Sequence, residues 1–354
     1  MRLVKVAVLG WAMMLGAWAQ AQNAVNAWHV AAPPVVAQEL KFSSGDAHLV
    51  GTVYMPAKGD HLPAVVVFHS ASAGTRDAGL YKHLTESLPA MGFAVLIYDR
   101  RGEGQSSGSA HNNSYETLTD DGIAGARAMA AQIPRIDPKK IGYWGLSQGG
   151  WLSVLAGGRD KNAAFVISVS APLTSPEEQM RFAMTNLMAL RGFSQSDIRQ
   201  MLDTRTAWTS YLRGSGSRSA ALAAFQNAET KPWFPLVYLP KGSELTDDPT
   251  HYAWTHEMDD DPATALEKVH APTLVVYGDS DPWIPVERSV EKLKMIQPQK
   301  RNIEYVVIDN ANHEMMFPLR ETMEVDARTV LSDQPQAPQY FMLMASWLAR
   351  QTAK

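Results

Sequence analysis

The stretch Ile141-Gly142-Tyr143-Trp144-Gly145-Leu146-Ser147-Gln148-Gly149-Gly150-Trp151 decides the fold class of this chain. It joins an apolar run to a segment, Trp151 to Ala156, that is typical of a helix. A serine on such a tight strand-to-helix turn takes a strained backbone, and the residues two places before and after it must have almost no side chain. Gly145 and Gly149 meet that demand, and the N-terminus of the following helix places partial positive charge near the hydroxyl. The pattern G-x-S-x-G between a strand and a helix is typical of a nucleophilic serine, so Ser147 is the candidate nucleophile, and an ordinary glycine-rich turn is the alternative.

Two later loops supply an acid and a histidine, each just past a predicted buried strand. Asp281 follows the apolar run Leu274–Tyr277, and His313 follows Ile303–Ile308. Open α/β sheets place their sites outside the carboxyl ends of the strands. With Ser147, these residues give the chain order serine, acid, histidine, in which catalytic triads occur.

Other residues compete for these roles. Asp279 lies two residues before Asp281 and is the alternative acid, whereas Asp309 is interpreted as a loop residue. His69 is interpreted as a brace for its loop and not as a base. The segment beginning at His313 starts like H-E-x-x-H but lacks the second histidine, so the zinc-protease motif is incomplete.

Composition limits the classes of protein. The chain has 354 residues, 45% of them hydrophobic, which is enough for one large core with an insertion. Its net charge is -4 and no basic cluster is evident, which argues against nucleic acid as a partner. Cysteine is absent, so disulfides, thiolate catalysis and cysteine-based zinc sites are excluded.

Residues 1–21 have the pattern of a secretory signal peptide. Arg2 and Lys5 form the charged region, Val6 to Trp18 the apolar region, and Ala19-Gln20-Ala21 a small-x-small cleavage site. The apolar region is short for a membrane span, although an uncleaved anchor is the alternative. We expect the mature chain to begin near Gln22, to be periplasmic or secreted, and to keep no stable membrane span after cleavage.

Alternating strand and helix patterns predict an α/β fold with a doubly wound, mostly parallel sheet. Asp137-Pro138 is expected to turn the chain into the strand that leads to Ser147. The other expected elements are a hairpin at 38–55, strands at Pro63–Phe68, Phe93–Tyr98 and Phe165–Val169, and helices at Asp77–Leu88, Tyr115–Gln132 and Gln339–Arg350.

Residues 172–262 interrupt this alternation and predict a helical cap, leaving 22–171 and 263–354 as the core. Three helices are expected there, one after the capping box that begins at Ser175, one from Ser194 and one over Ala220 to Ala228. The apolar side chains of the cap either pack it on the core or cover a substrate pocket. The candidates for touching substrate are Trp208, Trp233 and Trp254.

Three motifs carry a family resemblance. They are Tyr98-Asp99-Arg100-Arg101-Gly102-x-Gly104-x-Ser106, Trp144 to Trp151, and Gly278-x-x-Asp281-x-x-Ile284-Pro285. Over residues 38–171 and 263–350 the chain resembles the α/β-hydrolase superfamily, and within it the bacterial serine esterases and acyl hydrolases of the dienelactone-hydrolase-like and serine-aminopeptidase-like groups.

The resemblance implies an α/β-hydrolase fold, a catalytic triad of Ser147, Asp281 and His313, and no cofactor or metal. The oxyanion hole would consist of the backbone N–H groups of Gln148 and, by resemblance, Ala71. Relatives commonly carry His-Gly where this chain has His69-Ser70, which constrains the loop that should supply the second N–H. Asp99 and Arg100 are interpreted as a structural ion-pair and turn element beside the site.

The predicted function is that of an exported serine hydrolase that cleaves carboxylic esters or thioesters of small molecules through an acyl-enzyme. The alternatives are a peptidase or acyltransferase with the same triad, and a binding protein that only retains the fold. Peptidases that recognise a free amine need carboxylates in the cap, where Glu177, Glu178 and Glu229 are available. An intact triad argues against a binding protein.

Overall fold

The computed structural model describes residues 34–317 and 336–352. All elements below belong to the second of two units of the chain, which begins at Val35. The predicted signal peptide, residues 1–21, lies outside the described residues. Over the described ranges, none of the helices combines the length and the apolar character that a membrane crossing requires.

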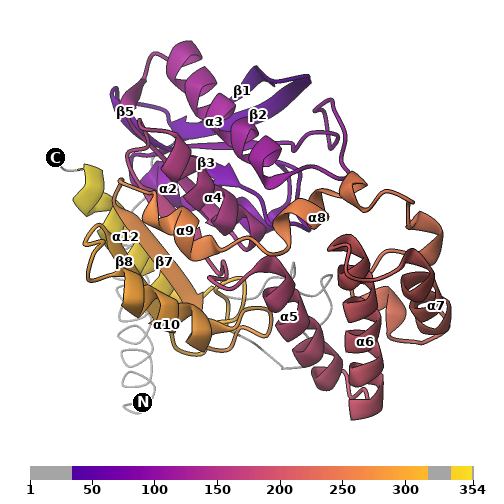
Figure 1. Cartoon of the computed structure of the whole chain (residues 1–354). Helices are drawn as coiled ribbons and strands as arrows, with labels where there is room; N and C mark the ends of the chain where they lie inside the picture. Colours follow the sequence, from indigo (N-terminus) through magenta and orange to yellow (C-terminus); the bar gives the residue numbers. More distant parts are fainter. Residues whose placement is uncertain (1–33, 318–335, 353–354) are drawn as a thin grey trace, which may run out of the picture. The chain divides into compact units, whose positions relative to one another are not determined.

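An eight-stranded sheet organises the second unit (Figure 1). The strand order is β1-β2-β4-β3-β5-β6-β7-β8, with antiparallel pairing of β1 to β2 and β2 to β4 and parallel pairing elsewhere. This mostly parallel sheet with helices confirms the predicted fold class. The strands are β1 (Val35–Ser44), β2 (Ala47–Pro56), β3 (Leu62–Phe68), β4 (Ala94–Tyr98), β5 (Ile136–Leu146), β6 (Val166–Val169), β7 (Thr273–Gly278) and β8 (Ile303–Ile308).

Helices cover both faces of the sheet (Figure 1). Successive β3 side chains point to opposite faces, so Val65 and Val67 pack in the cluster with α2 and α12, whereas Val66 and Phe68 pack with α3 and α4. All four are fully buried, and each such side chain contributes about 1.5–3 kcal/mol of transfer free energy. The elements of these layers are η1 (Gly79–Tyr81), α2 (Lys82–Ala90), α3 (Tyr115–Gln132), α4 (Gln148–Arg159), α9 (Pro262–Glu267), α10 (Val286–Ile296) and α12 (Pro338–Thr352).

The differences from the sequence prediction include one helix start and one predicted turn. The helix expected from Asp77 begins as α2 at Lys82, after a 3₁₀ turn, because Asp77 accepts a hydrogen bond from the Thr75 hydroxyl (2.6 Å) in the preceding turn. Asp137-Pro138 does not turn the chain into β5 but lies inside it. The β3–β5 register shifts next to this dipeptide, and such an irregularity tolerates a proline without N–H.

Between β6 and α9 the chain forms a largely helical insertion. Side-chain caps start its three long helices: Ser175, Ser194 and Ser217 accept hydrogen bonds from the N–H groups of Glu178, Asp197 and Ala220. Since Ser217 is a cap, α7 begins two residues before the predicted Ala220. The elements are α5 (Pro176–Leu190), α6 (Gln195–Leu212), α7 (Arg218–Ala228), η2 (Phe234–Leu236), η3 (Gly242–Glu244), η4 (Pro249–His251) and α8 (Ala253–Glu257). The delimitation of a cap at 172–262 stays a prediction.

The insertion has its own apolar cluster and one buried ion pair. Met184, Met201 and Phe225 are fully buried members of the cluster. The Arg205 guanidinium on α6 lies 2.7 Å from the Glu177 carboxylate on α5, and their side chains are only 1% and 7% exposed. Burial raises the pKa of Glu177, and the charge and hydrogen bonds of Arg205 oppose that rise. Each ion therefore depends on the other for its solvation.

We expect Arg205→Met to lower the free energy of unfolding by about 3–5 kcal/mol, because the substitution leaves the Glu177 carboxylate buried without its cation. Chemical denaturation followed by circular dichroism measures this loss. The matched control is Arg213→Met on the same helix, whose partner Asp259 is 57% exposed, and for such a surface pair the expected loss is below about 1 kcal/mol. Equal losses in the two variants would contradict a special role for the buried pair.

Candidate active site

Ser147 lies on a strained turn between β5 and α4. Its backbone has φ 58° and ψ -121°, an unusual conformation for a residue with a side chain. A Cβ on Gly145 would lie 1.9 Å from the carbonyl oxygen of Gly149, and a Cβ on Gly149 would lie 2.1 Å from that of Phe68. Both glycines are therefore required sterically, as the sequence pattern predicted. The turn is held by the N–H of Ser147, which donates to the carbonyl of Val169 on β6 (2.8 Å).

The carboxyl ends of β5 to β8 bring the three predicted triad residues to one edge of the sheet. Ser147 directly follows β5, Asp281 is the third residue after β7, and His313 follows β8. Backbone hydrogen bonds join these ends in series: after the Ser147 bond to β6, Ser170 donates to β7 (2.8 Å) and Asp279 donates to β8 (3.1 Å). The loop after β7 that carries Asp281 (the acid loop) and the loop after β8 that carries His313 (the histidine loop) are thereby fixed with respect to the turn at Ser147.

Asp281 and His313 form a buried pair. His313 Nδ1 lies 2.8 Å from Asp281 Oδ2, and the two side chains are 8% and 0% exposed. The other carboxylate oxygen accepts from the backbone N–H groups of Trp283 (2.8 Å) and Ile284 (3.2 Å). These bonds fix the carboxylate, which in turn orients the imidazole. With an N–H at Nδ1 directed to the carboxylate, the lone pair of the neutral ring that can take up a proton is on Nε2.

Asp279, the alternative acid, has different partners. Its carboxylate accepts from the backbone N–H of Asn310 (2.7 Å) and from the hydroxyl of Ser280 (3.0 Å). Asp279 thus braces the start of the histidine loop, while Asp281 contacts His313 itself. A second brace is buried Asn312, whose side-chain oxygen accepts from the N–H groups of Glu314 (3.1 Å) and Met316 (2.8 Å).

The residues predicted to form the oxyanion hole differ in local structure: Gln148 starts a helix, and Ala71 lies in a turn. Gln148 is the first residue of α4, so its N–H has no acceptor within the helix and carries the positive end of the helix dipole. Ala71 lies in an exposed turn after β3, in which the N–H of Ala73 donates to the carbonyl of Ser70 (3.4 Å). The chemistry of both N–H groups suits an oxyanion, but their use for that purpose stays a prediction.

One buried tyrosine clamps the turn that contains Ala71. The Tyr81 hydroxyl accepts from the N–H of Ser70 (2.8 Å) and donates to the carbonyl of Ala73 (2.9 Å). Ser70 stands where relatives commonly carry glycine, yet its φ lies outside the left-handed region. A serine at this position therefore causes no backbone strain in the turn.

His69 packs in an aromatic environment beneath this turn. Its ring meets those of Tyr81 and Tyr98 edge to face, at centroid distances of 5.3 and 4.9 Å. Burial, and next the charge of Arg100, lower the pKa of His69 to about 3. A neutral, enclosed ring agrees with the interpretation of His69 as a brace.

The Asp99 and Arg100 element is built differently from the expectation. Asp99 accepts from the backbone N–H groups of Arg76 and Gln105, both at 2.9 Å, and forms its ion pair with the Arg76 side chain (3.6 Å). Arg100 instead donates to the carbonyl of Ser70 (3.4 Å). The sequence could not show this pairing because Arg76 comes from a different loop.

The three tryptophans predicted as substrate contacts lie within the insertion. The rings of Trp208 and Trp254 are parallel at a centroid distance of 6.4 Å, and the Arg205 guanidinium lies within 6 Å of both ring centroids, at 5.7 and 5.8 Å. Trp233 is fully buried beside Phe234. These surroundings are those of packing residues, and contact with substrate stays a prediction.

Sequence reasoning missed Trp283, which lies closer to the paired residues. Its ring centroid is 6.0 Å from that of His313, and its carbonyl accepts a hydrogen bond from Gln179 on α5 (2.9 Å). A second α5 side chain, Asn186, donates to the carbonyl of Pro282 (3.3 Å). The insertion is therefore bound to the acid loop. The signal available in the sequence was the position of Trp283 inside the Gly278-x-x-Asp281-x-x-Ile284-Pro285 motif.

Within residues 34–317 and 336–352, the histidine, aspartate and glutamate side chains form no group of three placed to hold a metal ion. The chemistry that these groups offer is proton transfer by an imidazole oriented by Asp281, at the same edge of the sheet as a serine on a strained turn.

Comparison with known proteins agrees with this geometry. A family model described as the alpha/beta hydrolase fold matches residues 63–318, more than half of the chain. The chain belongs to the α/β-hydrolase superfamily. The matched range contains Ser147, Asp281 and His313, and the family's known members make a hydrolase the supported class of activity.

Individual relatives, and solved structures of other proteins, extend the comparison. The chain is 26% identical over 258 residues to the quorum-quenching protein AidA of Acinetobacter baumannii (strain MDR-ZJ06), covering 71% of this chain and 81% of AidA. An esterase structure from Pyrococcus furiosus aligns with TM-score 0.58 and 16% identity, covering 89% of this chain and 91% of the esterase. A dienelactone hydrolase-like promiscuous phosphotriesterase from metagenomic libraries aligns with TM-score 0.53 and 14% identity, covering 90% and 98%. At these identities the structural matches show a shared fold.

A titratable contact joins α8 of the insertion to α3 of the core. The Glu257 carboxylate accepts from the backbone N–H of Tyr115, the first residue of α3, and the Tyr115 ring meets that of Trp151 on α4 at 6.2 Å. Burial, to which the charge of Asp260 adds, raises the pKa of Glu257 to about 7, against the opposing hydrogen bond from Tyr115. The folded protein therefore holds a proton on Glu257 that the unfolded chain releases at lower pH.

We expect the stability of the native protein to carry a contribution from Glu257 that is complete below pH 4.5 and is lost as pH rises towards about 7. Glu257→Gln keeps an acceptor for Tyr115 and cannot ionise. Its melting temperature relative to the native protein should therefore rise across this window and become constant above it. Thermal melts at several pH values measure the difference, with Glu291→Gln as the control for an exposed carboxylate. A constant difference at all pH values would contradict the raised pKa.

Proposed function

We propose that this α/β hydrolase cleaves carboxylic esters or thioesters through an acyl-enzyme on Ser147. The observation that carries the proposal is the buried Asp281–His313 pair, fixed by backbone hydrogen bonds at the same edge of the sheet as the strained serine turn. A serine hydroxyl is a weak nucleophile near neutral pH and needs a base to take its proton during attack. The pair offers that base.

In the proposed reaction Ser147 Oγ attacks the carbonyl carbon while His313 Nε2 takes the hydroxyl proton. Collapse of the tetrahedral intermediate breaks the bond to the leaving group, which receives that proton from His313. Water then attacks the acyl-enzyme, again losing a proton to His313, and Ser147 recovers a proton as the acid is released. Asp281 holds the imidazole in one tautomer and stabilises the imidazolium.

Negative charge on the former carbonyl oxygen requires hydrogen-bond donors. The proposal gives this role to the N–H of Gln148, at the start of α4, and to that of Ala71, in the turn clamped by Tyr81. Donors that are already held in place stabilise the intermediate without reorganisation, and one of them typically contributes about 10²–10³ in rate.

Ester hydrolysis is favoured over an amine-recognising peptidase by the state of the three candidate glutamates. Glu177 is paired with Arg205, Glu178 with Arg288, and Glu229 accepts from the backbone N–H of Gly242. Each carboxylate already has a partner within the protein. A comparison of p-nitrophenyl acetate with aminoacyl-naphthylamides separates the two activities.

The proposal includes export to the periplasm or the medium. It is supported by the charged, apolar and small-x-small pattern of residues 1–21. The similarity to AidA, whose name describes quorum quenching, supports a small-molecule substrate.

Ser147→Ala should lower ester turnover by about 10⁴-fold or more and abolish the acyl-enzyme, because it removes the attacking oxygen. Burst kinetics with p-nitrophenyl acetate and mass spectrometry of the intact protein measure the two effects. An unchanged melting temperature provides the control for folding. A burst of normal size in the variant would refute the role of Ser147.

Asp281→Asn should reduce kcat by about 10⁴-fold, because the amide no longer favours the required tautomer. Asp279→Asn keeps an oxygen that can accept from Asn310, so we expect a loss below about 10-fold. Steady-state kinetics on p-nitrophenyl butyrate compare the matched variants. The reverse order of losses would make Asp279 the acid.

A further inference from the structure

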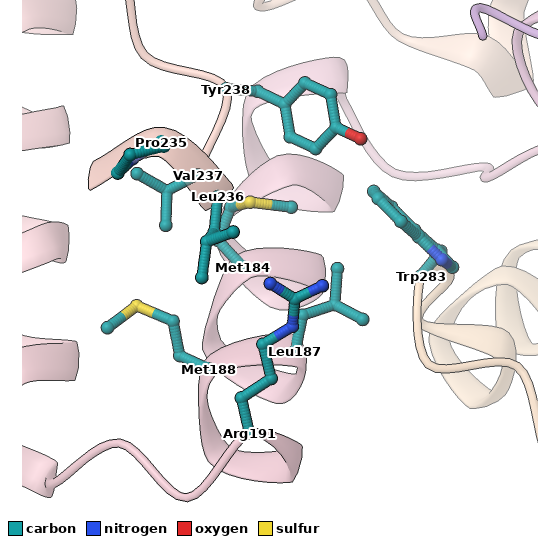
Figure 2. Close-up of a pocket in the computed structure, with 9 residues that line it drawn as sticks. All are labelled: Met184, Leu187, Met188, Arg191, Pro235, Leu236, Val237, Tyr238 and Trp283. Carbon is teal, nitrogen blue, oxygen red and sulfur yellow. The ribbon is translucent and has the colours of Figure 1, made fainter. Parts of the chain in front are cut away.

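An apolar cavity lies between the insertion and Trp283, and the mechanism described above does not use it. Its volume is about 190 Å³ (Figure 2). Four buried side chains form its inner wall, and Trp283 faces them across the cavity in Figure 2. The four are Met184, Leu187, Met188 and Val237.

Trp283 is the wall that this cavity shares with the candidate active site. Its ring lies 5.9 Å from that of Tyr238, which lines the cavity, and 6.0 Å from that of His313. The Trp283 backbone N–H binds the carboxylate of Asp281. One side chain therefore contacts both the imidazole and the cavity.

The cavity lies on the His313 side of the candidate site, and this position indicates which part of an ester it would bind. The imidazole must come within hydrogen-bond reach of the leaving-group oxygen in order to protonate it. The alcohol part of an ester therefore lies on the side of His313, next to Trp283. We propose that the cavity binds the alcohol moiety of the ester, and that this moiety is an unbranched alkyl group of about six carbons; this inference rests on the proposed function.

The size and chemistry of the cavity carry this choice. At roughly 30 Å³ for a water-sized group, 190 Å³ holds about six methylene or methyl groups. Methionine, leucine and valine walls offer dispersion contacts, and the flexible thioethers of Met184 and Met188 adapt to a linear chain. The cavity lining also includes two polar side chains, Arg191 and Tyr238, and both residues are exposed to solvent. A longer chain would extend past them into water and gain little.

Alkyl acetates test the proposal, because they all form the same acetyl-enzyme and differ only in the alcohol. From methyl to hexyl acetate, kcat/KM should rise about four-fold per methylene, as expected for burial of each group, and then become constant. Methyl alkanoates vary the acyl chain instead. Pentyl acetate should therefore be cleaved faster than its isomer methyl hexanoate, with rates measured by pH-stat titration.

Substitutions of Leu187 change the cavity in opposite directions. Leu187→Trp fills it and should reduce the pentyl-to-methyl acetate ratio of kcat/KM by at least ten-fold. Leu187→Ala enlarges it, so the rise of kcat/KM should continue to longer alcohols before it becomes constant. The matched control is Leu190→Trp, on the same helix but 41% exposed and outside the cavity lining, which should leave the ratio unchanged. The ratio does not depend on how much of each variant is folded.

The outcomes separate this inference from the proposed function. If methyl alkanoates respond to Leu187→Trp and alkyl acetates do not, the cavity binds the acyl part and the proposal is overturned. If ester turnover persists and neither series responds, the cavity has no part in binding, and the proposal is overturned while the proposed function stands. If no ester is cleaved, the proposed function fails, and ligand-observed NMR with 1-hexanol tests whether the cavity binds an alcohol. Binding to the Ser147→Ala variant that is lost when Leu187→Trp is added supports the role of the cavity. Absence of binding overturns that role.

Discussion

The backbone conformation at Ser147 is the constraint on which the rest of the site depends. A residue at φ 58° and ψ -121° needs surroundings that enforce it, and here the neighbouring backbone does so. Gly145 approaches the carbonyl of Gly149, and Gly149 approaches that of Phe68, closer than any Cβ allows. The turn can therefore exist only where three stretches of main chain meet. That contact places the serine hydroxyl at the edge of the sheet and starts α4 directly behind it.

The acid and histidine loops are fixed by the same means. Gly278, at the end of β7, lies so near Ala311 that an added Cβ would be 2.2 Å from its carbonyl oxygen. The Asp279 side chain ties β7 to the loop after β8, and the backbone of Trp283 and Ile284 holds the carboxylate of Asp281. Short side chains and main-chain hydrogen bonds thus do most of the positioning. The carboxylate of Asp281, held in this way, accepts the hydrogen bond that orients the imidazole of His313.

The insertion is joined to this edge of the sheet and also has a core of its own. Gln179 and Asn186 on α5 donate to carbonyls of the acid loop. The same helix contributes Glu177 to the buried ion pair, so α5 both stabilises the insertion and contacts the acid loop. On the other side, Glu257 joins α8 to the start of α3. The insertion is therefore joined to the core by contacts between segments far apart in the chain.

Local patterns in the sequence predicted a large part of this molecule. Period-two alternation and continuous apolar runs predicted most of the strands, and the capping pattern that begins at Ser175 marked a helix start that the structure has. Where a prediction was wrong, the reason was either a local hydrogen bond, as at Asp77, or a contact with another segment. The β3–β5 register shift keeps Asp137-Pro138 inside β5, and Arg76, not the adjacent Arg100, pairs with Asp99.

By itself, the sequence determined the type of sheet, the turn at Ser147 and the chain order of serine, acid and histidine, because each is fixed by short-range sterics or by the alternation of strands and helices. Only the tertiary structure decided which aspartate meets His313, that Trp208 and Trp254 stack around Arg205, and that Trp283 stands between the histidine and a cavity. These are encounters between side chains from separate elements. Their distances depend on how helices and loops pack together, and this packing cannot be seen in the spacing of residues along the chain.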